Sequence, residues 1–197
     1  MTAFTKNIWG IISGYALLGE RRLSNGAHLI GHVPHRAPEA YLHTLFPPAS
    51  DASIGRARTQ LVATDAFDQY IRFLVEHNGA NFFLGSLAFN GIRGELISRS
   101  SNDRQPFDLV ELNRFERPKN AEAEVLFIGS YNWDGSLIYL EPSGRVFVCN
   151  KRDATPYARW PNLVDMISHE LSRLVQFYDR EGRIIDNKAP RIPAGNI

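Results

Sequence analysis

The 197-residue chain contains a single cysteine, Cys149. An intramolecular disulfide is therefore impossible, which favours a reducing compartment such as the cytoplasm. Cys149 stands in the alternating apolar run Val146–Cys149, where strand packing explains a thiol better than nucleophilic catalysis does. No apolar run approaches the ~20 residues that a membrane-spanning helix needs. The stretch Ile8–Leu18 also lacks the basic start and the cleavage site of a signal peptide.

An excess of charge of one sign is also absent, because 22 basic residues face 21 acidic ones. We therefore do not expect a nucleic acid as the main partner, since phosphate binding requires a concentrated basic surface. The charge is uneven along the chain, and residues 103–141 contain twice as many acidic as basic side chains. This segment is either ordinary solvated surface or an acidic face for a basic protein partner.

The common catalytic motifs are missing. The chain has no Gly-x-Ser-x-Gly elbow and no Walker-type phosphate loop. His169-Glu170 resembles half of a zinc-protease motif, but the second histidine is absent. These absences predict a protein without catalytic residues.

Four neighbouring histidines are the best candidates for a metal site: His28, His32, His35 and His43. Spacings of three and four residues would bring such side chains together on one side of a helix. Pro34 interrupts that helix, and no cysteine or carboxylate completes a known ligand spacing. We therefore expect loop histidines, with neither a metal nor another cofactor.

Hydrophobic periodicity predicts two long helices. Thr64 or Asp65 can cap the first, which should stop at Asn78-Gly79. Pro161 suits the first turn of the second, which should end near Asp179–Gly182. Shorter helices are expected over Pro38–Phe46 and Asp108–Phe115.

Strand signals are grouped between the two long helices. They cover Phe82–Phe89, Arg93–Ile97, Val125–Ile128, Ser136–Leu140 and Arg145–Cys149. Asn90-Gly91 favours a hairpin between the first two strands, and the last three form a meander. The links are too short for helical crossovers, and Gly19–Pro48 has the composition of loops and turns. The pattern predicts an α+β fold in which an antiparallel sheet of about five strands packs against helices.

The turn at Asp134-Gly135 is the most informative segment for function. Trp133 either packs inward or lies exposed with Tyr131 and Asp134 as a binding surface. Nearby acidic residues extend this candidate surface. The candidate partner-binding residues are Tyr131, Trp133, Asp134, Glu122, Glu124 and Glu111.

In order and content, these segments resemble the SUKH superfamily, a widespread bacterial family that includes relatives of a yeast cell-wall-synthesis regulator. The matching features are Tyr70–Leu74 leading to Asn78-Gly79, the strand Phe82–Phe89, the glycines of Ile128-Gly129 and Asp134-Gly135, strands on either side of Gly144, and the apolar helix after Trp160. The resemblance covers residues 64–182. Residues 1–63 would then be an N-terminal extension that packs on the core, and residues 183–197 a C-terminal tail.

The resemblance implies a domain that acts by binding proteins and not by catalysis. Many bacterial members are inferred to be immunity proteins that neutralise a polymorphic toxin by covering it. We therefore expect a cytoplasmic, non-catalytic immunity protein whose partner is a toxin with a basic surface, and we expect no membrane partner. A regulatory or scaffold role in cell-envelope synthesis is the first alternative. A small metal-binding protein or enzyme is the second.

Overall fold

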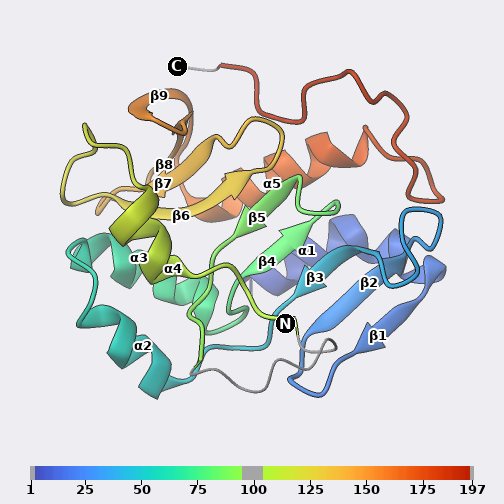
Figure 1. The fold of residues 1–197 in the computed structure, drawn as a ribbon, viewed down its shortest axis with the longest axis horizontal. Coiled ribbons are helices and arrows are strands. Elements are labelled where there is room, and N and C mark those ends of the chain that lie inside the picture. Colours follow the sequence, from blue (N-terminus) through green and yellow to red (C-terminus); the bar gives the residue numbers. More distant parts are fainter. Residues whose placement is uncertain (1–2, 95–103, 196–197) are drawn as a thin grey trace.

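A computed structural model of the chain describes residues 3–94 and 104–195. Their strands form one nine-stranded sheet in which each strand pairs antiparallel with the next one along the chain (Figure 1). The strands are β1 (Glu20–Arg22), β2 (His28–His32), β3 (Tyr41–Leu45), β4 (Ala80–Phe82), β5 (Leu87–Phe89), β6 (Leu126–Tyr131), β7 (Leu137–Leu140), β8 (Val146–Asn150) and β9 (Asp153–Trp160). The α+β fold class is thus confirmed.

The three longest helices cover one face of this sheet. The α-helices of the described residues are α1 (Ala3–Ile12), α2 (Asp51–Arg58), α3 (Thr64–Leu74), α4 (Leu109–Glu111) and α5 (Leu163–Val175), with a 3-10 helix η1 (Ser13–Leu18) and a π-helix η2 (Leu112–Glu116). Figure 1 shows α1 and α5 behind the strands, where the two helices pack on each other. Their apolar residues join those of α3 and of the sheet in the main core.

Local sequence explains the two long helices. In α3, Phe67, Tyr70 and Leu74 recur at helical spacing and are fully buried. In α5, the Asn162 side chain accepts a hydrogen bond from the Asp165 backbone N–H at 2.9 Å and caps the helix. Both helices were predicted, but each ends earlier than expected, at Leu74 and at Val175.

Glycine is required at two positions of the β6–β7 hairpin. A Cβ atom at Gly129 would lie 2.2 Å from the Ala88 carbonyl oxygen, so any side chain would push β6 away from β5. Gly135 adopts a φ of 78°, which favours glycine, and it closes the turn into β7. The predicted strands over Val125–Ile128, Ser136–Leu140 and Arg145–Cys149 are confirmed as β6, β7 and β8.

The sheet has nine strands and not the predicted five. Three of the additional strands, β1, β2 and β3, come from Gly19–Pro48, where loops were expected. The helix predicted over Pro38–Phe46 is wrong, because residues Tyr41–Leu45 pair with β2 and β4. Strand pairing has overridden the local helix-start signal at Pro38. The remaining strand, β9, contains Pro156, a residue that argues against a strand in the sequence.

The region Phe82–Phe89 is two strands and not one. Phe83 and Leu84 have positive φ angles of 51° and 58° and turn the chain between β4 and β5. Asn90-Gly91 accordingly makes no hairpin, and Gly91 instead bridges to Asp108. Arg93 and Gly94 are not in a strand, and the rest of the strand predicted over Arg93–Ile97 lies outside the described residues.

The helix predicted over Asp108–Phe115 is present as α4 and η2. The Asp108 carboxylate accepts hydrogen bonds from the backbone N–H groups of Val110 and Glu111, which starts the helix. Leu112 from this segment joins Phe127, Tyr139 and Phe147 in a second, smaller apolar cluster. Across residues 3–94 and 104–195, no helix has the length and apolar character needed to cross a membrane.

Candidate functional site

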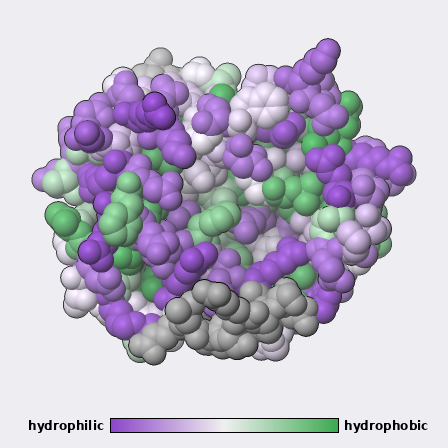
Figure 2. Space-filling model, viewed as in Figure 1, coloured by the Kyte–Doolittle hydropathy of each residue, from purple (hydrophilic) through white to green (hydrophobic). Residues whose placement is uncertain are grey.

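The face of the sheet opposite the long helices carries a row of residues that is small and polar at its centre and apolar at both ends. Successive cross-strand partners define the row, which runs through Leu29, Thr44, Asn81, Ala88, Ser130 and Leu137. These residues take no part in the main core. Figure 2 shows this face, with apolar surface near its centre between hydrophilic margins. We call it the open face.

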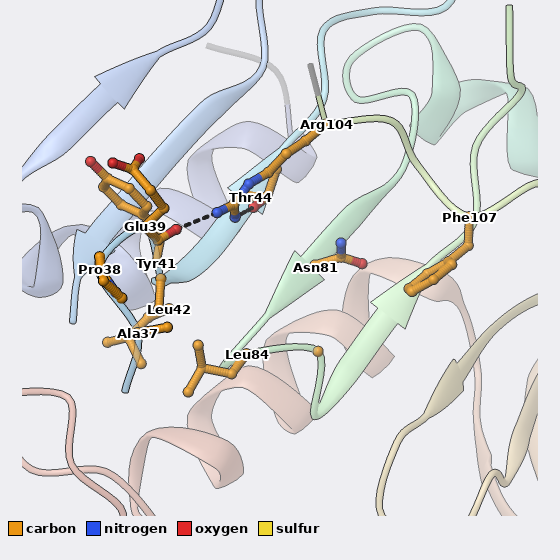
Figure 3. Close-up of a pocket in the computed structure, with 12 residues that line it drawn as sticks. Ala37, Pro38, Glu39, Tyr41, Leu42, Thr44, Asn81, Leu84, Arg104 and Phe107 are labelled. Carbon is orange, nitrogen blue, oxygen red and sulfur yellow. Dashed lines mark hydrogen bonds between the residues drawn. The ribbon is translucent and has the colours of Figure 1, made fainter. Parts of the chain in front are cut away.

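A cleft of about 680 Å³ lies on the open face above β3 and β4 (Figure 3). Its floor includes Thr44 and Asn81, and its walls include Tyr41, Leu84 and Phe107. Phe107 is 54% exposed, which is unusual for so large an apolar side chain. We call this hollow the open-face cleft.

Arg104 fixes one wall of the cleft. Its guanidinium donates to the Glu39 carbonyl oxygen and, at 3.4 Å, to the Thr44 hydroxyl, and it lies 5.9 Å from the centre of the Tyr41 ring. The Arg104 carbonyl oxygen accepts a hydrogen bond of 2.6 Å from the Asn25 amide. Arg104 thereby ties the segment before α4 to β3 and holds Tyr41 at the margin of the cleft.

Asn81 supplies a polar group to the floor. Its Oδ1 atom is buried, and no hydrogen-bond donor of the described residues reaches it. A buried acceptor without a donor carries a desolvation cost of about 1–3 kcal/mol. The floor of the open-face cleft therefore contains a buried acceptor whose hydrogen bonding is incomplete within the described residues.

A second hollow of about 250 Å³ shares Phe107 with the cleft and extends over β6 and β7. Its walls carry both signs of charge, with acidic side chains from the α4–η2 segment and its cap (Asp108, Glu111, Glu116) and two basic ones from elsewhere (Arg93, Lys151). The open face thus combines an apolar and weakly polar cleft with a charged extension on the far side of Phe107.

The predicted partner-binding residues fall on different surfaces. Glu111 lines the second hollow, and Glu122 and Glu124 are exposed in the segment before β6. Trp133 is 37% exposed, and Asp134 is exposed beside it. The Asn132 amide donates to the Leu84 carbonyl oxygen at 3.4 Å, which brings the Trp133 turn next to one end of the open-face cleft.

The expectation that Tyr131 is exposed is wrong. Tyr131 is fully buried at the end of β6, on the helix-covered face, and its hydroxyl donates to the Glu170 carboxylate at 2.8 Å. Burial and the neighbouring carboxylate raise the pKa of Tyr131 well above its ordinary value. Arg173 also bonds Glu170, so these three side chains form a buried polar network between β6 and α5.

The four histidines of the metal hypothesis are separated. His28 pairs with Glu20 at 2.6 Å and stacks on Trp9, whereas the His32 ring bonds the Pro38 carbonyl oxygen. His35 is exposed in the turn after β2. Among residues 3–94 and 104–195, no group of three or more His, Cys, Asp or Glu side chains is arranged to hold a metal ion.

His43 is buried in an aromatic cage. Its ring lies 4.5 Å from Phe83 and 5.5 Å from Tyr15 between ring centres. Burial lowers the pKa of His43 to about 3, and neither ring nitrogen has a hydrogen-bond partner among the described residues. A neutral imidazole is therefore part of the core. Cys149 is also buried, and burial raises its pKa to about 12, which does not suit a nucleophile.

Sequence reasoning missed the residues of the open-face cleft. In β3 only Tyr41 is partly exposed and the four residues after it, Thr44 among them, are buried, so no alternation in the strand marks the cleft. Arg104 and Phe107 lie in a polar, Pro-containing segment whose place over β3 and β4 is set by tertiary contacts alone.

Comparisons of the chain with family models, with curated proteins and with solved structures found no match.

Proposed function

We propose that this chain is a non-catalytic protein-binding module of the SUKH type that protects a bacterial cell by binding a toxin directly in the cytoplasm. The observation that supports this best is the open face, where the cleft and its charged extension meet at the exposed Phe107. Exposed aromatic side chains beside polar groups are common anchors of protein interfaces.

The geometry suits a protein partner better than a small substrate. The open-face cleft is open to solvent and not an enclosed cavity, and a second hollow adjoins it at Phe107. The Trp133 turn lies at one end and adds a second large aromatic side chain. A partner that covers Tyr41, Phe107 and Trp133 together would bury the central anchors and leave charged residues at the rim.

Acidic side chains outnumber basic ones by three to two around the second hollow, which favours a basic partner. Glu111 and Glu116 line the second hollow, and Asp134 is exposed beside Trp133. Acidic side chains at the rim of an interface mainly accelerate association with a basic surface and select against acidic ones. The toxin would accordingly present Lys or Arg side chains around an apolar contact.

The test is co-expression with the product of each toxin-like neighbouring gene. We expect the wild-type chain to restore growth and to co-purify with one of these products. Phe107→Ala should weaken binding at least about fivefold, because truncation of a central anchor commonly costs more than about 1 kcal/mol. Leu17→Ala is the matched control, since Leu17 is 93% exposed in η1, away from the open face.

Several outcomes would contradict the proposal. Failure of a folded wild-type chain to bind or protect against any neighbouring toxin candidate would remove the immunity function. Equal loss of protection in Phe107→Ala and Leu17→Ala would remove the open face as the interface. Recovery of envelope-synthesis proteins in place of a toxin would favour the regulatory alternative.

A further inference from the structure

The C-terminal segment places a cation on the Trp133 ring. The Arg191 guanidinium carbon lies 4.6 Å from the centre of that ring, the shortest of the cation–aromatic contacts identified in the described residues. Trp133 is nevertheless 37% exposed, so Arg191 covers only part of it. Arg191 is distant in sequence from the β6–β7 turn, and this contact joins the turn to the segment that follows α5.

The Arg191 guanidinium lacks hydrogen-bond acceptors at this position in the described part of the chain. Its Nε and Nη1 atoms are buried, and within residues 3–94 and 104–195 no acceptor reaches either of them. A guanidinium usually pairs with a carboxylate, and buried N–H groups without acceptors are costly. The attraction of the cation to the ring is of the same order as that cost, so the net gain from seating Arg191 is small.

The segment that carries Arg191 is held mainly at its two ends. At one end, the Ile185 N–H donates to the Phe177 carbonyl oxygen at 2.9 Å. At the other, Ile192 packs against the main core. Residues 185–188 between them are exposed, and the Arg191 carbonyl oxygen accepts only a long hydrogen bond of 3.4 Å from Arg173. Local opening of such a segment requires little free energy.

The residue after Trp133 is Asp134, and its carboxylate forms no ion pair with Arg191. Asp134 is exposed, and its oxygens accept hydrogen bonds from the Ser136 N–H at 2.9 Å and from the Ser136 hydroxyl at 2.8 Å, which fixes its orientation. Among the described residues, Asp134 forms no salt bridge. Trp133 and Asp134 are consecutive exposed residues of one turn, and Arg191 contacts the ring without pairing with this carboxylate.

On the basis of the protein-binding function proposed above, we propose that Trp133 and Asp134 form an arginine-binding site. Arg191 occupies this site in the free protein. In the complex, an arginine side chain of the partner takes the place of Arg191 and adds the ion pair with Asp134. The site specifies one feature of the partner surface, an exposed arginine next to the apolar contact on the open face.

The probe is the peptide N-acetyl-Gly-Arg-Gly-amide, titrated into the full chain while the Trp133 indole N–H resonance is followed by NMR. Its control is the same peptide with citrulline, which keeps the planar shape and removes the charge. We expect the arginine peptide to bind Arg191→Gln at least about threefold more tightly than it binds the wild type, because the Trp133 ring is no longer occupied. The citrulline peptide should leave the resonance unchanged in both.

Three further variants sharpen the result. Asp134→Asn should weaken arginine binding in the Arg191→Gln background, and Trp133→Ala should abolish it. Lys188→Gln removes a charge from the same exposed segment and should leave the affinity at the wild-type value. A dispersed NMR spectrum in each variant shows that the fold is retained.

The inference is wrong if the arginine peptide fails to shift Trp133 in Arg191→Gln, if citrulline shifts it equally, or if wild type and Arg191→Gln bind with the same affinity. A chain that protects cells but shows one of these results keeps the proposed function and loses the arginine site. A chain that binds arginine at Trp133 but has no toxin partner keeps the arginine site and loses the proposed function.

Discussion

The two faces of the sheet are built from different residues and differ in how completely their side chains are packed and hydrogen-bonded. The helix-covered face is aromatic and closely packed, with Phe73 in ring contact with Phe4, Tyr70 and Phe89. The open face carries a smaller apolar cluster over β6–β8, but from β3 to β6 its floor is small and polar, with an exposed Phe107 and a buried Asn81 oxygen without a donor. The first arrangement stabilises the fold, whereas the second leaves groups whose interactions are incomplete. Such groups are what a binding surface supplies to its partner.

The largest contrast between the faces should come from one pair of phenylalanine substitutions. Phe73→Ala should lower the free energy of unfolding by about 3–5 kcal/mol, because it removes a fully buried ring and leaves a cavity. Phe107→Ala should change it by less than about 1 kcal/mol, since that ring is already half exposed. Urea denaturation followed by circular dichroism measures both. Similar values for the two variants would contradict the difference between the faces.

The next largest effect concerns acid stability of the helix-covered face. The folded-state pKa of His43 is about 3, below the ordinary value of 6.5, so the unfolded chain binds the extra proton first as the pH falls. The stabilising effect of a neutral His43 is complete above pH 6.5 and should decline by about 3 kcal/mol between pH 7 and pH 4. His77, whose pKa burial also lowers, adds to the same trend.

Denaturation curves of His43→Phe and His35→Gln across this pH range test the assignment. In His43→Phe, the free energy of unfolding should vary much less with pH than in the wild type, whatever its value at pH 7. His35 is exposed, and its replacement should leave the slope unchanged. If the free energy of unfolding of His43→Phe falls with pH as steeply as that of the wild type, other groups cause the acid sensitivity.

The smallest effect should distinguish two asparagines outside the main core. The Asn113 amide donates to the carbonyl oxygens of Leu109 and Phe127, and its oxygen accepts from the Phe127 N–H. Asn113→Ala should therefore cost about 2 kcal/mol, since buried backbone groups lose their partners. Asn81→Ala should instead leave stability unchanged or raise it by up to about 1–3 kcal/mol, since it removes a buried acceptor without a donor, and it should weaken partner binding because Asn81 lines the cleft. A large loss of stability in Asn81→Ala would make Asn81 structural.

The parts of the fold that were predictable are those with strong local patterns. Phe67, Tyr70 and Leu74 have helical spacing, and the β6–β8 meander has turn residues at each end. The chain reversal at Phe83 and Leu84 carries no such signal, because large apolar residues rarely take positive φ angles. Its conformation follows from packing, including the stacking of the Phe83 ring on Tyr178.

The candidate site was only partly predictable. Trp133 and Asp134 belong to one turn, and their exposure was one of two stated outcomes. The open-face cleft instead brings together Tyr41, Asn81 and Phe107 from three distant segments. Tertiary contacts such as those of Arg104 decide that assembly, and no local periodicity reports them.

The packing of α1 on α5 has a consequence for the order of events during synthesis. Every strand pairs with its neighbour along the chain, so the sheet can grow piece by piece as the polypeptide emerges from the ribosome. Helix α1 precedes every strand, yet the apolar side chains of Phe4, Ile8 and Ile12 belong to a core that α5 completes. These side chains lack their packing partners until Leu163–Val175 has been translated. The main core can therefore close only after α5 has emerged from the ribosome.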